Sequence, residues 1–264
     1  MIRVEDLRVT FSAGTVMETR ALQGLSAEVA AGEFVTVIGS NGAGKSTLLN
    51  CLTGDVAPTA GRIVIDGTDV SSWPAPRRAA LVARVFQDPL AGTCEGLTIE
   101  ENLALAAARG TRRGLDKALT AARREEFRSK ISRLGLNLEN RLGDRMGLLS
   151  GGQRQAVSLV MATLRPTKIL LLDEHTAALD PRMQAFVLDL TRELVEAEKL
   201  TTLMVTHSMR QALSLGTRSF MLHEGKVVLD VAGEERSRLE VGDLMALFAK
   251  VRGEELDSDS LLLS

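Results

Sequence analysis

The sequence predicts an α/β fold in which helices alternate with the strands of a mostly parallel sheet. Three short runs, FVTVIG, KILLLD and TTLMVTH, are dominated by apolar residues, which is typical of strands that are buried on both faces. They occupy residues 34–39, 168–173 and 201–207. Helical patterns lie between these runs, and strands that alternate with helices indicate a wound parallel sheet.

The chain begins with strands of another kind. The segment IRVEDLRVTF (2–11) alternates apolar and polar residues, as a strand with one buried face does. The segment GRIVIDG (61–67) predicts a second strand, and its Asp-Gly pair favours a tight turn. We expect these early strands to form a smaller antiparallel layer beside the main sheet.

Six segments have the periodicity of helices, namely 45–54, 98–108, 115–134, 152–164, 181–198 and 208–214. Three of them fall within a stretch, 89–164, that is expected to be almost wholly helical. Its basic piece, ARGTRRGLDK, predicts a surface connection between helices, in which the arginines form a solvated face. The arginines interpreted in this way are Arg112, Arg113, Arg123 and Arg124.

The composition excludes several classes of protein. The net charge of −2 gives no general attraction to nucleic acid or to anionic lipid. Two cysteines, Cys51 and Cys94, cannot build a disulfide framework, so a reducing cytosol is the expected compartment. The start of the sequence has no apolar signal core. No stretch approaches the roughly 18–20 apolar residues of a membrane span, so we do not expect the chain to cross a bilayer alone.

The segment GSNGAGKS (39–46) matches the phosphate-binding pattern G-x-x-x-x-G-K-[ST] between a predicted strand and a predicted helix. Its glycines let the backbone curl so that N–H groups point at a phosphate. Lys45 is expected to reach the β- and γ-phosphates, Ser46 to bind Mg²⁺, and Thr47 to cap phosphate from the first helical turn. The predicted nucleotide-binding residues are Gly39, Ser40, Asn41, Gly42, Ala43, Gly44, Lys45, Ser46 and Thr47.

Two adjacent acidic residues end the apolar run ILLLDE (169–174). Open α/β sheets bind ligands at the carboxyl ends of their strands. We therefore expect Asp173 to hold Mg²⁺ through water, and Glu174 to polarise the water that attacks the γ-phosphate. An exposed acidic strand end is the alternative interpretation, which the phosphate-binding motif disfavours.

Two single polar residues are candidates by position. Gln87 follows the apolar LVARVF, and its amide is a candidate contact for Mg²⁺ or for the attacking water. His207 ends a predicted strand on the same sheet edge and is a candidate partner of the γ-phosphate. A lone histidine or glutamine at a strand end is more often a polar cap, so both assignments depend on the other motifs.

A second candidate anion site is LSGGQ (149–153), where a serine and two glycines open an apolar helical pattern. Free backbone N–H groups and the helix dipole favour an anion at such a helix N-terminus. The residues assigned to this site are Ser150, Gly151, Gly152 and Gln153.

Taken in order, these motifs resemble those of the ATP-binding subunit of ABC transporters, over residues 2 to about 232. GSNGAGKST, Gln87, LSGGQ, ILLLDE, AALD (177–180) and His207 are similar to the family's P-loop, Q-loop, signature, Walker B with catalytic glutamate, D-loop and switch histidine. The resemblance implies that Asp180 contacts nucleotide and that Phe11 stacks on adenine. A place for Phe11 in the core is the alternative.

The resemblance implies a P-loop NTPase fold with a RecA-like core, a small antiparallel β subdomain and an inserted α-helical signature subdomain. The implied ABC ATPase domain covers 1–240, with the core and β layer at 1–88 and 165–240 and the helical subdomain at 89–164. Residues 241–264 are expected to form a C-terminal helix and an acidic tail.

The family's mechanism implies ATP and Mg²⁺ as ligands and a second copy of the chain as partner. Two copies pack head to tail, so that the signature of one covers the γ-phosphate held by the P-loop of the other. ATP then joins a twofold dimer.

A chain without fused membrane helices or long coiled-coil insertions is similar to bacterial importer ATPases. This implies separate transmembrane permease subunits, a periplasmic or lipid-anchored substrate-binding protein, no nucleic-acid partner, and a place on the cytoplasmic face of the inner membrane. The strip TCEGLTIEENL (93–103) is the expected permease contact. The alternatives are a soluble ABC ATPase that acts on a macromolecule and the motor of an ABC exporter.

Most members of the family have proline after the catalytic glutamate, whereas this chain has His175. The surrounding string is similar to importer ATPases thought to take up aromatic amino acids or related small solutes. His175 either packs in the interior or tunes nearby carboxylates with pH. We favour packing.

Overall fold

A computed structural model describes residues 1–111, 114 and 117–252 of the chain. Its main sheet has six strands, in which β10 is antiparallel to β9 and the other neighbours are parallel. In order across the sheet the strands are β10 (Lys226–Ala232), β9 (Arg218–His223), β3 (Phe34–Gly39), β8 (Thr201–Val205), β7 (Ile169–Asp173) and β6 (Val82–Val85). The mostly parallel sheet predicted from the three apolar runs is confirmed. Strands β6, β9 and β10 are additional to those predicted.

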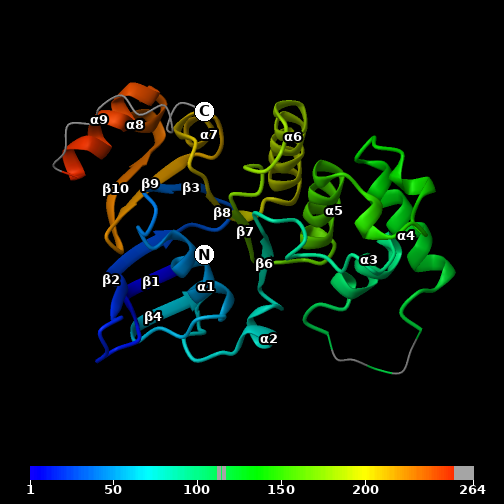
Figure 1. Ribbon diagram of the computed structural model, residues 1–264, viewed down its shortest axis with the longest axis horizontal. Helices are drawn as coiled ribbons and strands as arrows, with labels where there is room; N and C mark the ends of the chain where they lie inside the picture. The colour runs from blue at the N-terminus through cyan, green and yellow to red at the C-terminus, as the bar shows by residue number, and fades with distance from the viewer. Residues whose placement is uncertain (112–113, 115–116, 253–264) are drawn as a thin grey trace.

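In chain order the helices are α1 (Lys45–Thr53), α2 (Ala75–Arg78), α3 (Ile99–Ala107), α4 (Ala121–Ser132), α5 (Gly151–Thr163), α6 (Pro181–Glu198), α7 (Met209–Ser214), α8 (Gly233–Ser237) and α9 (Val241–Arg252), with short 3-10 turns at Leu138–Asn140 and Met146–Leu148. In the described part of the chain, none of these helices is both long enough and apolar enough to cross a membrane. Helices α5 and α6 lie beside the main sheet, and α3 and α4 lie beyond α5, farther from the sheet (Figure 1).

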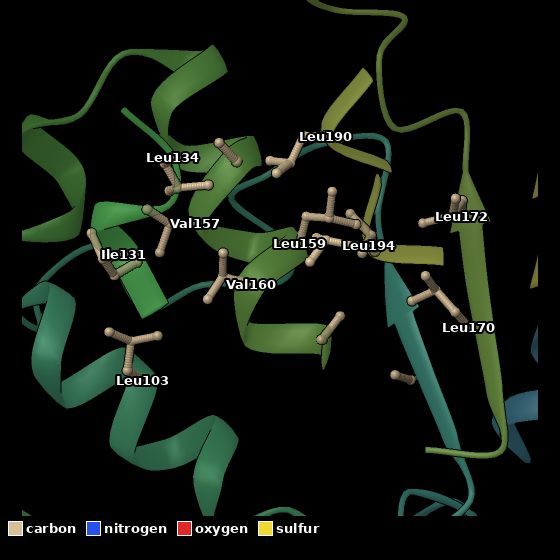
Figure 2. Close-up of a cluster of buried hydrophobic side chains, with 14 of the residues drawn as sticks. Leu103, Ile131, Leu134, Val157, Leu159, Val160, Leu170, Leu172, Leu190 and Leu194 are labelled. Carbon is tan, nitrogen blue, oxygen red and sulfur yellow. The ribbon is translucent and has the colours of Figure 1, made fainter. Parts of the chain in front are cut away.

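Both faces of the main sheet are covered, which explains its continuous apolar runs. In β7, Leu170 and Leu172 face a cluster built from α3, α4, α5 and α6 (Figure 2). Ile169 and Leu171 alternate with them and lie in a second cluster, with α1 and the smaller sheet. Every residue of the strand before Asp173 is therefore apolar, because each one is buried.

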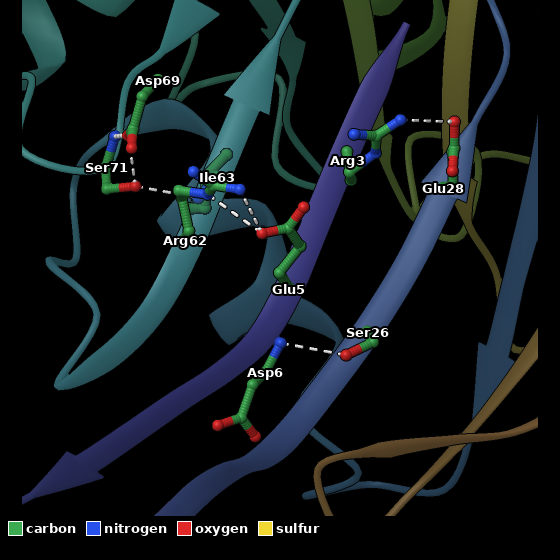
Figure 3. Close-up of polar contacts among 9 residues, drawn as sticks. All are labelled: Arg3, Glu5, Asp6, Ser26, Glu28, Arg62, Ile63, Asp69 and Ser71. Carbon is green, nitrogen blue, oxygen red and sulfur yellow. Dashed lines mark hydrogen bonds and ion pairs between the residues drawn. The ribbon is translucent and has the colours of Figure 1, made fainter.

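The smaller sheet is antiparallel, as predicted for the early strands. Its strand order is β2 (Thr19–Val29), β1 (Ile2–Phe11), β4 (Ala60–Ile65) and β5 (Thr68–Asp69). Ion pairs cross it between Arg3 and Glu28 and between Arg62 and Glu5 (Figure 3).

A bulge in β1 changes the phase of its side chains. The backbone at Asp6 has a φ of 45°, and its N–H donates to Ser26 Oγ instead of continuing the ladder (Figure 3). The buried positions consequently step by three residues from Val4 to Leu7. A further register shift follows Val9 and leaves Phe11 41% exposed. The alternative that Phe11 belongs to the core is therefore wrong.

The stretch 89–164 is less continuously helical than expected. The helix predicted over 115–134 begins only at Ala121, because Thr120 is an N-cap whose side chain accepts from Arg123 N–H. Residues 117–120 are not helical, and 115–116 lie outside the described residues. Arg123 and Arg124 are exposed as predicted, whereas Arg112 and Arg113 also lie outside the described residues.

The C-terminal helices pack back on the main sheet. Leu244 and Phe248 of α9 lie in a buried cluster with Ile38, Met209 and Met221. The predicted acidic tail after α9, 253–264, lies outside the described residues.

Candidate functional site

The segment 39–46 connects β3 to α1 through glycines in the left-handed region of backbone space. The φ angles are 154° at Gly39, 78° at Gly42 and 100° at Gly44. A Cβ on Gly39 would lie 2.4 Å from the carbonyl oxygen of Leu222 in β9, so no side chain fits there. The Cβ position of Gly42 has no heavy atom within 4 Å and is open. The loop therefore has the tight curl that phosphate-binding loops need.

The Lys45 side chain lies inside this loop and is bonded to its backbone. Its Nζ donates to the carbonyl oxygens of Gly39, at 2.7 Å, and Ser40, at 3.0 Å. Burial lowers the pKa of the Lys45 ammonium, and the nearby charges of Glu174 and Asp173 act in the opposite direction. A cation removed from water and solvated by carbonyl groups is prepared to bind an anion.

The rest of the loop follows the prediction in its placement. Asn41 is exposed and Ala43 is buried, while Ser46 and Thr47 lie in the first turn of α1. The hydroxyl of Ser46 is on an exposed residue, at the end of the helix where the dipole is positive.

The two acidic candidates lie where β7 ends, on the same edge of the sheet as the loop. Glu174 has a φ of 47°, an unusual conformation for a residue with a side chain. Its Oε1 lies 2.6 Å from His207 Nε2, which projects from the end of the neighbouring strand β8. The structure thus brings together Lys45, Asp173, Glu174 and His207, which are far apart in the sequence.

Gln87 follows β6 on this edge and is exposed. The carbonyl oxygen of the preceding residue, Phe86, accepts a hydrogen bond of 3.1 Å from Gln155 Nε2 in α5. The position of Gln87 is therefore linked directly to the helix that begins at the signature.

The signature segment caps α5. Ser150 Oγ accepts from Gln153 N–H at 3.2 Å, and Gln153 Oε1 accepts from Ser150 N–H at 3.1 Å. Gly151 is exposed and has open space at its Cβ position, whereas a Cβ on Gly152 would lie 2.7–2.9 Å from side-chain atoms of Met183. The helix start is thus rigid, and its first residue faces open space.

Asp180 has a capping role as well. Its Oδ1 accepts from the N–H groups of Arg182 and Met183, both at 3.1 Å, and so begins α6. Met183 in the first turn of α6 is also the residue that covers Gly152, so the helix that Asp180 caps lies against the signature of the same chain.

His175 packs in the interior, as favoured from the sequence. It is 2% exposed, and its Nε2 lies 3.0 Å from the hydroxyl of Thr191 in α6. Burial lowers the pKa of His175 to about 4. The ring is therefore neutral at ordinary pH and does not adjust the charge of its acidic neighbours.

Sequence reasoning missed Arg84 in β6. Its Nη2 lies 2.6 Å from Asp173 Oδ2, and its Nη1 lies 2.7 Å from Asn50 Oδ1 in α1. The only signal in the sequence is one arginine inside the apolar run LVARVF.

Comparisons with known proteins agree with this geometry. Residues 22–177 match the family model described as ABC transporter. A tyrosine transport ATP-binding protein of Clostridioides difficile (strain R20291) is 41% identical over 248 residues, which are 94% of this chain and 98% of that protein. The thiamine import ATP-binding protein ThiQ of Shigella flexneri serotype 5b (strain 8401) is 37% identical over 210 residues, 80% of this chain and 85% of that protein.

The fold is also similar to solved structures of ATP-binding cassettes. A dimeric ATP-binding cassette in a post-hydrolysis state, bound to ADP and phosphate, superposes with a TM-score of 0.76 at 27% identity. The superposition covers 88% of this chain and 98% of that chain. The P-loop, the signature and the end of β7 all lie inside the part that matches the family model.

Proposed function

Because this chain belongs to the ABC transporter family of ATP-binding proteins, which are ATPases coupled to transport, we propose that it powers the import of a small solute through separate permease subunits. The observation that carries the proposal is the meeting of Lys45, Asp173, Glu174 and His207 at one edge of the main sheet. A buried cation suits the binding of phosphates, and carboxylates beside it suit the binding of Mg²⁺ and the orientation of an attacking water.

Each group has a distinct role in this proposal. Lys45 and the N–H groups of the P-loop bind the β- and γ-phosphates of ATP. Glu174 accepts a hydrogen bond from the attacking water and orients it. His207 holds Glu174 through their 2.6 Å contact, and it is the proposed partner of the γ-phosphate. Phe11 offers an exposed ring on which adenine stacks.

The residues present also fit Mg²⁺. The Ser46 hydroxyl, the Asp173 carboxylate and the Gln87 amide supply oxygen atoms, which this ion prefers. Among the described residues, no group of three or more His, Cys, Asp or Glu is placed so that these side chains alone could hold a metal ion. Such a sparse protein shell suits an ion that keeps several waters and binds substrate phosphates. When bound, Mg²⁺ neutralises charge that develops on the phosphates.

A second copy of the chain completes the site. Ser150, Gly151, Gly152 and Gln153 offer hydrogen-bonding groups at the start of α5, while β6, β7 and β8 lie between α5 and α1 in Figure 1. The signature therefore serves the nucleotide of a partner chain in a head-to-tail dimer. The dimeric relative bound to ADP and phosphate supports this arrangement.

The strip 93–103 is suited to transmit movement from a permease to the signature. Asn102 is buried and braces the strip through bonds to the N–H and carbonyl of Cys94, at 2.8 and 3.0 Å. Glu95 pairs with Arg154 of α5 at 3.3 Å, and its carbonyl accepts from Gly147 N–H. These contacts connect the strip to the helix that begins at LSGGQ. A permease that displaces the strip would therefore displace this helix as well.

The relatives guide the choice of partners and solute. By name, one relative is a tyrosine transport protein and another is a thiamine import protein, and the first is the more similar. We infer an aromatic amino acid or a related compound as the solute. The subunit then lies on the cytoplasmic face of the inner membrane, bound to a permease that receives solute from a periplasmic or lipid-anchored binding protein.

Co-purification tests the proposal. The tagged chain is isolated from detergent-solubilised membranes of its own organism, and the stoichiometry of the material and its ATPase activity are measured. A helical membrane protein in equal amount, with ATPase activity that depends on Lys45, is the expected result. A stable complex with a soluble macromolecule and no membrane partner would contradict it.

A further inference from the structure

We propose that Arg84 positions the Asp173 carboxylate for Mg²⁺ and sets the distance between β7 and α1. This inference rests on the proposed function, in which Asp173 and Ser46 hold the ion. Arg84 belongs to none of the nucleotide-binding motifs, and it acts through Asp173 and Asn50 rather than on the nucleotide itself.

The guanidinium connects the two elements that carry the proposed Mg²⁺ residues. Its Nη2 lies 2.6 Å from Asp173 Oδ2 at the end of β7, and its Nη1 lies 2.7 Å from Asn50 Oδ1 in α1. Helix α1 also carries Ser46 in its first turn. One rigid planar group therefore fixes how far the carboxylate lies from the helix that bears the hydroxyl.

The position is unfavourable for stability alone. The Arg84 side chain is 11% exposed, and its Nε is buried without a hydrogen-bond partner among the described residues. An unpaired buried N–H carries a desolvation cost. The group is held instead by its two Nη atoms and by the Phe86 ring, whose centroid lies 4.7 Å from Cζ. A costly arrangement that is fixed from three sides indicates a functional constraint.

The contact with Arg84 leaves one carboxylate oxygen of Asp173 for the ion. Oδ2 is engaged by the guanidinium, and the structure records no hydrogen bond to Oδ1 from the described residues. The bond stops rotation of the carboxylate, so that Oδ1 keeps one direction. Hydrogen bonds of this kind to a metal-binding carboxylate orient it, and their removal weakens metal binding or activity.

The positive charge of Arg84 has the opposite effect, because a cation near Asp173 repels Mg²⁺. A substitution that removes the charge would mix the two effects. Arg84→Lys retains the charge, but a compact ammonium cannot bond to Asp173 and Asn50 with the geometry of the fork. Asn50→Ala retains Arg84 and removes the hydrogen bond of its Nη1, which then keeps only the longer ion pair with Asp55, at 3.8 Å.

The test is a Mg²⁺ titration of nucleotide binding with the purified full chain, using a fluorescent, non-hydrolysable ATP analogue. Arg84→Lys should raise the Mg²⁺ concentration for half-maximal binding about tenfold. Asn50→Ala should raise it in the same direction, and binding of the analogue in EDTA should remain as in the wild type. The control is Arg62→Lys, in a pair of 2.7 Å with Glu5 on the smaller sheet, and should leave the midpoint unchanged. Melting temperatures check that each variant folds.

Three outcomes would overturn the proposal or its premise. If Arg84→Lys and Asn50→Ala keep the wild-type Mg²⁺ midpoint, even with lower melting temperatures, Arg84 is only structural. If Arg84→Lys behaves as wild type and Arg84→Met binds Mg²⁺ more tightly, the residue acts as a charge and does not position Asp173. If wild type and Arg62→Lys bind no nucleotide, the proposed function itself fails. Should Arg84→Lys not fold, Asn50→Ala decides alone.

Discussion

Glu174 and His207 are in direct contact, with 2.6 Å between Oε1 and Nε2. The φ of 47° at Glu174 is an unusual backbone conformation that the surrounding fold must maintain. Its backbone N–H donates to the carbonyl of Val205 in β8, which supplies part of that support. At the residue scale, the contacts of the fold itself therefore hold Glu174 and His207 together.

Glu174→Gln tests the proposed base. The amide retains the shape and a hydrogen bond to His207, but it cannot accept a proton from water. We expect ATP affinity close to wild type and turnover reduced about a hundredfold or more, measured by phosphate release. Glu193→Gln, on the exposed surface of α6, is the control and should be fully active. Near-normal turnover of Glu174→Gln would remove Glu174 from the catalytic role.

His175 predicts a dependence of stability on pH. Its pKa is 6.5 as an ordinary side chain and about 4 in the folded chain, because burial disfavours the charged ring. Between these values the unfolded chain binds a proton that the folded chain does not. The free energy of unfolding must therefore fall as the pH falls through this window, by about 3 kcal/mol at most.

His175→Gln isolates this contribution, since glutamine donates a hydrogen bond to Thr191 but does not titrate. Urea unfolding of both proteins at several pH values between 7 and 4 gives the measurement. The variant should lose less stability than wild type on acidification. Parallel pH profiles would contradict the assignment.

At the scale of elements, α7 is held at its C-terminal end by an arginine from α8. Arg236 is 8% exposed, and it donates to the carbonyls of Ala212 and Leu215 and to Ser219 Oγ. Helix α7 follows directly on His207, so this contact connects the C-terminal helices to the catalytic edge of the sheet.

Arg236→Met should lower the free energy of unfolding by about 2–3 kcal/mol, because it leaves buried carbonyl groups unpaired. Arg238→Met is the matched control. Arg238 pairs with Glu234 on the surface at 3.0 Å, and its loss should cost less than about 0.5 kcal/mol. Urea unfolding compares the two. Equal decreases in the free energy of unfolding for the two variants would mean that the contacts of Arg236 do not contribute the inferred stability.

The sequence predicts some strands of the fold better than others. The strands at 34–39 and 168–173 were clear, because burial on both faces makes every position apolar. Strand β2 was missed because its bulged pairing with β1 buries Leu22, Leu25 and Val29, and this spacing of three and four residues is that of a helix. Periodicity cannot identify a strand whose register shifts.

The candidate site also has some features that the sequence predicts and others that it does not. The P-loop and the signature are local motifs, so their chemistry can be predicted from adjacent residues. The contacts of Arg84 with Asp173 and of Met183 with Gly152 join segments that only the tertiary fold brings together. No local pattern contains that information.

At the scale of the whole molecule, one chain carries two proposed anion-binding segments on separate elements. Asn41 in the P-loop and Ser150 in the signature are both exposed. A second copy, related by a twofold axis, would bring each P-loop against the partner's signature and would make two equal sites. This complementation is the central claim of the account, since it explains why LSGGQ is present at all.

Cysteine cross-linking between two different variants tests this complementation of the P-loop by the partner's signature most directly. Cys51, which is buried, and Cys94, which is exposed, are first replaced by alanine. Asn41→Cys and Ser150→Cys are then made in separate chains, mixed, and oxidised with ATP under non-hydrolysing conditions. A disulfide requires Cα atoms within about 7 Å, so only close contact gives a product. The account predicts a band of doubled mass that needs both variants and ATP. A monomeric mixture, together with an intrachain disulfide in a single chain carrying both substitutions, would show that LSGGQ serves its own nucleotide and would contradict the account.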